Sequence, residues 1–395
     1  MATTTPWPAW ARSTNNGKRR RNGDHAGRHT PRPRSGRHPA QQRRAPYADE
    51  LARLRDSDAG TRPEGWQLSP RAVRAFILGD EALGIGRKFY GDDPLVERAI
   101  VTLMGHQGLM LVGEPGTAKS LLSELLSAAI TGDSALTIQG TAGTTEDYIK
   151  YSWNYALLLA EGPSRRALVP SPLYRAMAAG KLVRFEEITR CPPEIQDVMI
   201  SLMSEKQLMV PELGDAARLH ARRGFNVIAT ANLRDRGVHD MSSALKRRFN
   251  FETVRPIADH AFELELVMGQ VRRDLESAGV QVEVERDVVA LLVTTFQELR
   301  AGRTSEGTAL KTPDAVMSTA EAVNVAYAAA LEARHFGDGR LTPRELANQL
   351  QGVVLKDSAD DLRRVQHYFD TVVQERARRD RQWKLFRDAG RALWP

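Results

Sequence analysis

The sequence has a single cysteine, Cys191, among its 395 residues. One cysteine excludes an intrachain disulfide and any zinc site built from several cysteines. The chain also has no apolar run close to the roughly 20 residues that a membrane span needs. Its first residues contain no apolar core of the kind found in signal peptides. These absences lead us to expect a cytoplasmic protein without a membrane partner.

Acidic residues are scarce in one part of the chain. Residues 1–46 hold eleven Lys and Arg but one acid, Asp24, so the other 349 residues are net −3 within the total of +7. This stretch is nearly free of aliphatic residues and cannot bury enough apolar surface to offset the entropy of ordering, so we expect a disordered basic tail. Two interpretations stay open, a solvated tail without a dedicated partner and an electrostatic contact with nucleic acid or another polyanion. Aromatic residues for stacking on bases are not interleaved with its arginine cluster.

The rest of the chain divides by its pattern of apolar residues. Residues 47–91 predict a linker with one or two short helices. Residues 92–256 alternate short apolar runs with helical patterns, which is typical of an α/β core with a parallel sheet. Residues 257–355 predict a helical lid, and residues 356–395 predict charged amphipathic helices. The five expected strands of the core cover residues 109–112, 136–139, 182–185, 225–230 and 249–254.

The first expected strand leads into GEPGTAKS, a phosphate-loop pattern in which Ala118 replaces the second glycine. Backbone N–H groups of such a turn and the following helix N-terminus form a cradle for phosphates. We expect Lys119 to reach the β and γ phosphates and the Ser120 hydroxyl to ligate Mg²⁺. Ala118 should have the negative φ of a residue that enters a helix, which alanine adopts easily. The expected nucleotide-binding residues are Gly113, Glu114, Pro115, Gly116, Thr117, Ala118, Lys119 and Ser120.

Two adjacent acids, Glu186 and Glu187, follow the apolar run LVRF. In a nucleotide-hydrolysing site the first acid lies on the metal side, and the second is the base that polarises the attacking water. The alternative is two exposed acids at the end of a strand. Arg184 is unusual here because a strand buried on both faces should be apolar. It faces either a neighbouring subunit or an acid.

Two further polar segments follow later strands. FNVIATAN ends in Asn232, which could orient the water between Glu187 and the γ-phosphate. SSALKRRFN carries Arg247 and Arg248, either of which could stabilise transition-state charge in the site of a neighbouring subunit. A turn-forming asparagine and a solvated basic turn are the alternatives.

Together these segments resemble the MoxR-type AAA+ ATPases over about residues 92–355. GEPGTAKS looks like that family's phosphate loop, and residues 186–210 resemble its Walker B segment. VIATAN is similar to the sensor 1 strand, and ALKRRF to the arginine-finger segment, where Arg248 takes the finger's place. The chain departs from the family twice, with Glu186 where the family has Asp and Asp314 where it has the sensor 2 arginine. Lys311 is the nearest substitute for that arginine.

The resemblance implies an ATPase with ATP and Mg²⁺ as cofactors and a homo-oligomeric ring, for which six subunits are expected. It also implies remodelling of a protein client, often with a von Willebrand A-domain partner. Two other interpretations stay open, a nucleotide-dependent scaffold with little hydrolysis and a nucleic-acid motor that uses the basic tail. We expect waters around Mg²⁺ to absorb the extra methylene of Glu186. Glu186→Asp should then leave turnover equal or higher.

Overall fold

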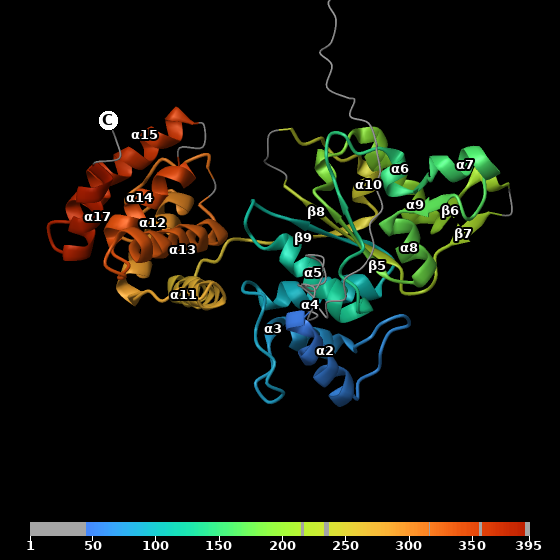
Figure 1. Cartoon of the computed structure of the whole chain (residues 1–395), viewed down its shortest axis with the longest axis horizontal. Coiled ribbons are helices and arrows are strands. Elements are labelled where there is room, and N and C mark those ends of the chain that lie inside the picture. The colour runs from blue at the N-terminus through green and yellow to red at the C-terminus, as the bar shows by residue number, and fades with distance from the viewer. Residues whose placement is uncertain (1–44, 215–216, 233–236, 316, 355–357, 392–395) are drawn as a thin grey trace, which may run out of the picture. The chain divides into compact units, whose positions relative to one another are not determined.

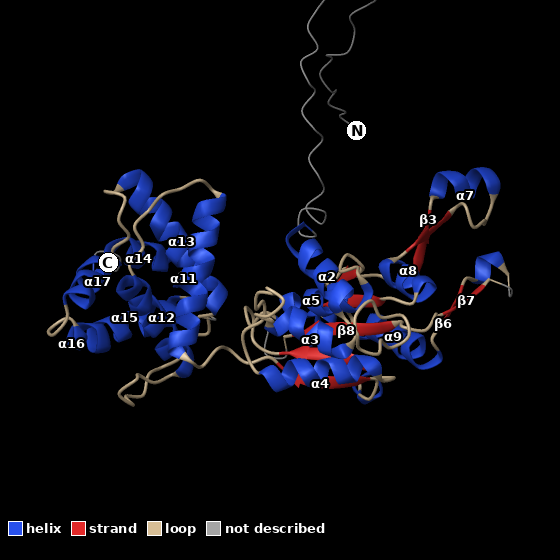
Figure 2. Cartoon of the chain, turned by 90° about the horizontal axis from the view of Figure 1, so that it is seen from below, coloured by secondary structure: helices blue, strands red, loops and turns tan. Residues whose placement is uncertain are grey.

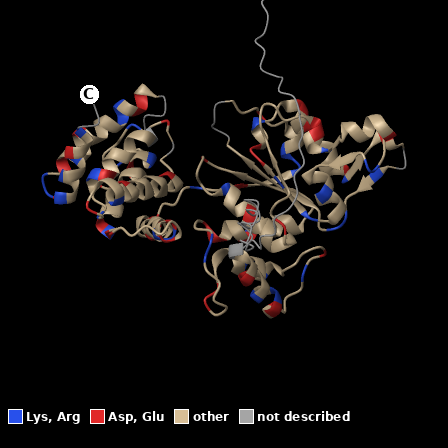
Figure 3. Ribbon diagram, viewed as in Figure 1, with Lys and Arg blue, Asp and Glu red and all other residues tan. Residues whose placement is uncertain are grey.

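The computed structural model describes residues 45–214, 217–232, 237–315, 317–354 and 358–391 (Figure 1). The expected basic tail, residues 1–46, falls almost entirely outside the described residues. The structure therefore does not test whether the tail contacts nucleic acid. A contact with nucleic acid through the tail stays a prediction. In the described part of the chain, acidic and basic residues are interspersed along the helices (Figure 3).

The centre of the α/β core is a five-stranded sheet. All its neighbouring strands are parallel, and their order is β2-β5-β8-β1-β9. The strands are β1 (Gly108–Val112), β2 (Thr137–Gln139), β5 (Leu182–Glu186), β8 (Asn226–Ala231) and β9 (Phe249–Thr253). The expected fold class is confirmed, and each of the five strands lies within a residue or two of its predicted range.

Helices cover both faces of this sheet (Figure 1). Successive side chains of a strand point to opposite faces. Leu109 and Leu111 accordingly belong to one buried cluster, and Met110 and Val112 belong to the other. The first cluster takes in α4 (Asp93–Met104) and α5 (Lys119–Thr131), and the second takes in α8 (Pro172–Ala179) and α9 (Pro193–Glu205).

The segment that we expected to be a linker is part of the packed body. It contains α2 (Ala45–Ser57) and α3 (Pro70–Leu78). Leu54, Trp66 and Phe76 are buried in the same cluster as the first strand. The apolar residues of this segment are spread between turns, and they pack on the sheet through tertiary contacts that a local pattern does not show.

Two small hairpins extend the core and were not predicted (Figure 2). One pairs β3 (Tyr151–Trp153) with β4 (Leu168–Pro170), and the other pairs β6 (Gln207–Met209) with β7 (Arg218–His220). The Tyr151 hydroxyl donates a hydrogen bond of 2.7 Å to Glu212 and so joins them. The short elements around them are α6 (Glu146–Ile149), α7 (Tyr155–Glu161), η1 (Ile188–Arg190), η2 (Pro211–Leu213) and α10 (Ser243–Lys246).

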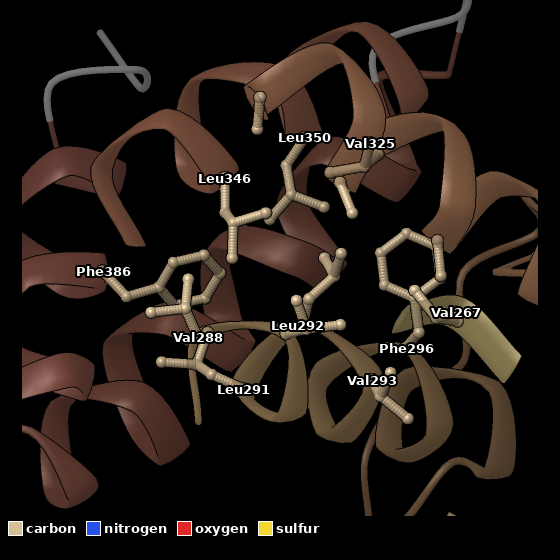
Figure 4. Packing of buried hydrophobic residues seen from close by; sticks show 14 of the residues in the cluster. Val267, Val288, Leu291, Leu292, Val293, Phe296, Val325, Leu346, Leu350 and Phe386 are labelled. Atoms are coloured by element: carbon tan, nitrogen blue, oxygen red, sulfur yellow. The ribbon is translucent and has the colours of Figure 1, made fainter. Parts of the chain in front are cut away.

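The expected lid and the expected C-terminal helices share one hydrophobic core. Figure 4 shows Phe386 packed in the same interior as Val288, Leu346 and Leu350. None of the helices in the described part of the chain is long and apolar enough to cross a membrane. The elements are α11 (His260–Ser277), α12 (Arg286–Ala301), α13 (Thr319–Phe336), α14 (Pro343–Val354), α15 (Ala359–Tyr368), the π-helix η3 (Phe369–Val373), α16 (Gln374–Arg376) and α17 (Arg381–Arg391).

Candidate nucleotide site

The phosphate loop connects β1 to α5, as the sequence predicts. Ala118, the residue before α5, has a φ of 64° and a ψ of 24°. The predicted negative φ is therefore wrong. The loop must reverse direction immediately before the helix begins, and this turn uses the left-handed region, which costs a residue with a Cβ about 1–2 kcal/mol.

The two glycines of the loop lie where a side chain would not fit. A Cβ at Gly113 would lie 2.3 Å from the carbonyl oxygen of Val254, and one at Gly116 would lie 2.3 Å from the Ser318 side chain. Gly116 also has a φ of 75°. The loop is therefore a bare backbone cradle, which fits a nucleotide phosphate.

Lys119 is the first residue of α5 and is 8% exposed. Its ammonium donates to two carbonyl oxygens of the loop, those of Gly113 at 3.0 Å and Glu114 at 2.6 Å. These contacts hold the positive charge inside the loop, where a phosphate would lie.

The carboxylate of Glu186 ends β5 and accepts four hydrogen bonds. Its Oε2 accepts from the hydroxyls of Ser120 at 2.8 Å and Thr230 at 2.7 Å. Its Oε1 accepts from the Ser123 hydroxyl and an Arg184 Nη2, both at 2.7 Å. Glu186 is 4% exposed. The reading of Glu186 as an exposed acid is therefore wrong.

The unusual arginine of this strand faces an acid, which was one of the two alternatives. Burial alone would raise the pKa of Glu186, but the charge of Arg184 and the hydroxyls of Ser123, Thr230 and Ser120 outweigh it and lower the pKa. Glu186 is therefore held as an anion. Its extra length is taken up by protein donors rather than by water alone.

Glu187 follows in a left-handed conformation, with a φ of 54°. Its N–H donates to the Thr230 hydroxyl at 3.0 Å, so this hydroxyl contacts both acids. Its carboxylate lies 2.7 Å from the Nε of Arg190 in the next turn. Its side chain is 35% exposed, so this is a half-buried pair.

Asn232 lies where the sequence places it, directly after β8 and 8% exposed. The two arginines after α10 differ from each other. Arg248 donates to the Ser204 hydroxyl at 3.0 Å and the Ala244 carbonyl at 3.1 Å, whereas Arg247 is exposed. Their action in a neighbouring subunit stays a prediction.

One cavity of about 870 Å³ brings several of these groups together. The phosphate loop from Pro115 to Ser120, Glu187, Thr230 and Asn232 all line it. Its other walls were not predicted from the sequence, and they include Tyr47, Glu50, residues 86–90 and 255–257 and side chains from the helical region. These residues belong to no motif, and only tertiary structure brings them here.

The helical region contributes two arginines to the cavity wall, Arg273 of α11 and Arg300 of α12. Arg300 pairs at 2.8 Å with Glu263, which is fully buried. Lys311 and Asp314 are not among the residues that line the cavity. Asp314 instead pairs with Arg364 at 3.0 Å. The structure thus gives no support to Lys311 as a substitute for a sensor arginine.

Among the described residues, no group of three or more His, Cys, Asp or Glu side chains could hold a metal by itself. Mg²⁺ is commonly held by one or two carboxylates together with phosphates and waters. The Ser120 hydroxyl and the Glu186 carboxylate, 2.8 Å apart beside the phosphate loop, fit that pattern. The site therefore suits Mg²⁺ that binds together with the phosphates of a nucleotide.

The phosphate loop follows β1, the fourth strand in the sheet order, while a polar residue follows the adjacent strand β8 and paired acids lie at the end of the next strand, β5; this arrangement defines an AAA+ nucleotide site. Comparison with known protein families also places the chain among the AAA+ proteins. The family described as the AAA domain of the dynein-related subfamily matches residues 108–249. The family described as the YehL-like AAA+ ATPase C-terminal domain matches residues 261–393.

The chain belongs to the YehL-like AAA+ ATPases. It is 53% identical to YehL of Escherichia coli (strain K12) over 348 residues, which cover 88% of this chain and 95% of YehL. A protein of Staphylococcus aureus (strain USA300) is 28% identical over 145 residues, or 36% of this chain and 54% of that protein. NtrX from Brucella abortus in complex with ADP is similar with a TM-score of 0.46 and 14% identity, over 77% of this chain and 64% of NtrX. The chain thus spans less than two thirds of the staphylococcal protein and of NtrX. The predicted AAA+ relationship is confirmed.

Proposed function

We propose that this chain binds ATP with Mg²⁺ and hydrolyses it. The observation that carries the proposal is the hydrogen bond between the hydroxyl of Ser120, the last residue of the phosphate loop, and the carboxylate of Glu186 at the end of β5. Ser120 and Glu186 would hold Mg²⁺, and Lys119 and the loop backbone would hold the phosphates. When bound, the metal neutralises charge on the phosphate oxygens.

The base in this proposal is Glu187. It follows the metal-side acid directly and lines the same cavity as the phosphate loop. Its N–H donates to the Thr230 hydroxyl, which holds the backbone of Glu187 beside Glu186. Asn232 ends the neighbouring strand and lines the same cavity, and it would orient the water that Glu187 polarises.

We further propose a ring of identical subunits, expected to be a hexamer, that remodels a protein client. Arg248, or the more exposed Arg247, would reach the nucleotide of the neighbouring subunit. A partner with a von Willebrand A domain is part of this proposal. The support is family membership and the exposed position of Arg247 at the end of α10.

The test compares wild type with Glu187→Gln and Lys119→Ala. We expect Mg²⁺-dependent phosphate release from wild type, and Glu187→Gln should bind ATP without turning it over. Lys119→Ala should lose nucleotide binding itself. Turnover by Glu187→Gln at the wild-type rate would refute the role of the base. The ATP-loaded Glu187→Gln protein is also the form in which to measure ring size by light scattering and to capture a client.

A nucleotide-dependent scaffold with little hydrolysis is the second candidate. The observation that favours it is the ion pair of Glu187 with Arg190, which engages one oxygen of the carboxylate that hydrolysis needs. Under this alternative, wild type and Glu187→Gln both bind ATP and neither releases phosphate. Turnover that appears in Arg190→Gln but not in wild type would show that this ion pair is what holds the site inactive.

A further inference from the structure

The two unusual residues of β5 contact each other. Arg184 and Glu186 are two positions apart on one strand, so their side chains point to the same face. That face carries α5, which supplies Ser120 and Ser123 to the network. Arg184 is 8% exposed and Glu186 is 4% exposed. A buried arginine and a lengthened acid thus occur in one connected network.

Arg184 is held in place by groups other than the acid. Its Nε donates to the Ser123 hydroxyl at 2.9 Å, and its Nη1 donates to the Ser134 carbonyl at 3.1 Å. Its Nη2 donates to the carbonyl of Ser120 at 3.1 Å as well as to Glu186. The guanidinium is therefore a fixed fork, and Glu186 meets it in one orientation.

The length of the acid decides which partners it can reach. A glutamate extends about 1.5 Å further than an aspartate, the length of one carbon–carbon bond. This extension places Oε1 between Arg184 and Ser123, while Oε2 stays at Ser120 and Thr230. A shorter acid that kept the Ser120 contact would leave the buried guanidinium with one acceptor fewer.

We propose that Arg184 is a positioning residue for the metal-side acid and that Arg184 and Glu186 function as a matched pair. Arg184 donates to Oε1 of Glu186, and this contact fixes Oε2 beside the Ser120 hydroxyl. This inference rests on the proposed function, because it assigns the Ser120 and Glu186 oxygens to Mg²⁺. Either residue changed alone weakens Mg²⁺ binding, and both changed together restore it; this replaces the expectation from the sequence that Glu186→Asp alone leaves turnover equal or higher.

The test is a double-mutant cycle of wild type, Arg184→Met, Glu186→Asp and Arg184→Met/Glu186→Asp. The measured quantity is the affinity for a fluorescent ATP analogue, titrated with Mg²⁺ and, separately, in EDTA. Each single change should raise the Mg²⁺ concentration at the midpoint about 10- to 100-fold, as loss of a partner behind a metal ligand does. The double variant should return to within about threefold of wild type, since residues in contact are not additive. Affinity in EDTA should stay unchanged in all four proteins.

Two further variants separate positioning from folding. Lys181→Met removes a cation at the other end of the same strand, where Lys181 pairs with Asp133 at 3.2 Å, and should leave the Mg²⁺ midpoint unchanged. Arg184→Lys keeps the charge without the fork and should give an intermediate midpoint. The melting temperature without nucleotide shows whether each variant folds, and it should follow the same cycle, low in the single variants and recovered in the double variant.

The inference is overturned if the two single effects multiply in the double variant, or if Arg184→Met leaves the Mg²⁺ midpoint at the wild-type value. In either case wild type still binds nucleotide with Mg²⁺, and the proposed function stands. If wild type itself binds no nucleotide in either condition, the proposed function fails, and the metal role of the pair fails with it.

Discussion

Arg376 should be a sensitive position in the helical region. Its guanidinium forms a two-pronged pair with Glu298 of α12, at 2.7 and 2.9 Å. It also lies 4.8 Å from the centre of the Trp383 ring. Glu298 accepts a further hydrogen bond of 2.6 Å from Tyr368, which is fully buried. This cluster joins α12 to α15, α16 and α17, which end the described part of the chain.

Arg376→Met should lower the unfolding free energy mainly because it leaves the buried Glu298 carboxylate without a cation. Methionine fills much of the space, but Glu298 remains as a charge that is 5% exposed and has no cation. Removal of one partner from a buried pair costs about 3–5 kcal/mol. The Arg376 side chain is 16% exposed, which places the loss near the lower end. We expect the unfolding free energy to fall by about 3 kcal/mol and the melting temperature by about 4 °C, at about 2.1 cal/mol/K of unfolding entropy per residue over about 350 residues.

Thermal and urea unfolding of the full chain, followed by far-ultraviolet circular dichroism, measure this loss. The double variant Arg376→Met/Glu298→Gln should recover at least half of it, because the uncompensated charge is gone and Tyr368 keeps an acceptor. Arg363→Met serves as the control, since its pair with Asp360 is exposed, and should leave the melting temperature unchanged. A loss below about 1 kcal/mol in Arg376→Met, or a double variant that loses as much as both single variants together, would refute the reasoning.

Three other predictions concern stability without nucleotide. Ala118→Gly should raise the unfolding free energy in urea by about 0.5–1 kcal/mol, because glycine adopts the left-handed φ without strain but gains freedom in the unfolded chain; a decrease would contradict the assigned backbone. Phe76→Ala should lower it by about 3–5 kcal/mol, since Phe76 is fully buried, whereas a residue in a loose linker would show almost no change. Burial alone would raise the pKa of Glu298, but hydrogen bonds from Arg376 and Tyr368 outweigh it and lower the pKa. The stability from this group is complete above the unfolded pKa of about 4.3 and is lost as the pH falls through the folded value. The difference in unfolding free energy between wild type and Glu298→Gln should accordingly shrink from pH 6 to pH 3, and a constant difference would show that the charge of Glu298 does not matter.

The sheet and the phosphate loop could be predicted because their signals are local. Each strand is a short apolar run, and β1 leads straight into a glycine-rich turn and a helix. Glu186, Glu187 and Asn232 end neighbouring strands of a parallel sheet, so their convergence on one edge follows from topology. That part of the site needs no knowledge of distant contacts.

The rest of the site and the packing of the N-terminal helices depend on tertiary contacts, which the pattern of apolar residues along the sequence does not show. The partner of Arg184 could not be chosen between two alternatives, because the choice depends on which face of β5 carries α5. The backbone of Ala118 was mispredicted because the geometry of the loop, rather than the preference of alanine, sets its φ. Arg273 and Arg300 lie on amphipathic helices and look like solvated residues until the cavity is known. The segment with Trp66 and Phe76 looked like a linker because its apolar residues are separated by turns.

The hydrogen bonds around Glu186 all run in one direction. Arg184 donates to Ser123, which donates to Glu186, and the N–H of Glu187 donates to Thr230, which also donates to Glu186. The N–H of Glu187 thus directs the Thr230 hydrogen at Glu186, whereas the Ser123 hydroxyl also lies 2.9 Å from the Ser120 carbonyl oxygen and can donate to either acceptor. An amide at this position places its NH₂ group either against the Arg184 guanidinium or beside the hydroxyls of Ser120 and Thr230. Glu186→Gln, often used as a gentle neutralisation, therefore also removes the buried counter-charge of Arg184 in this protein.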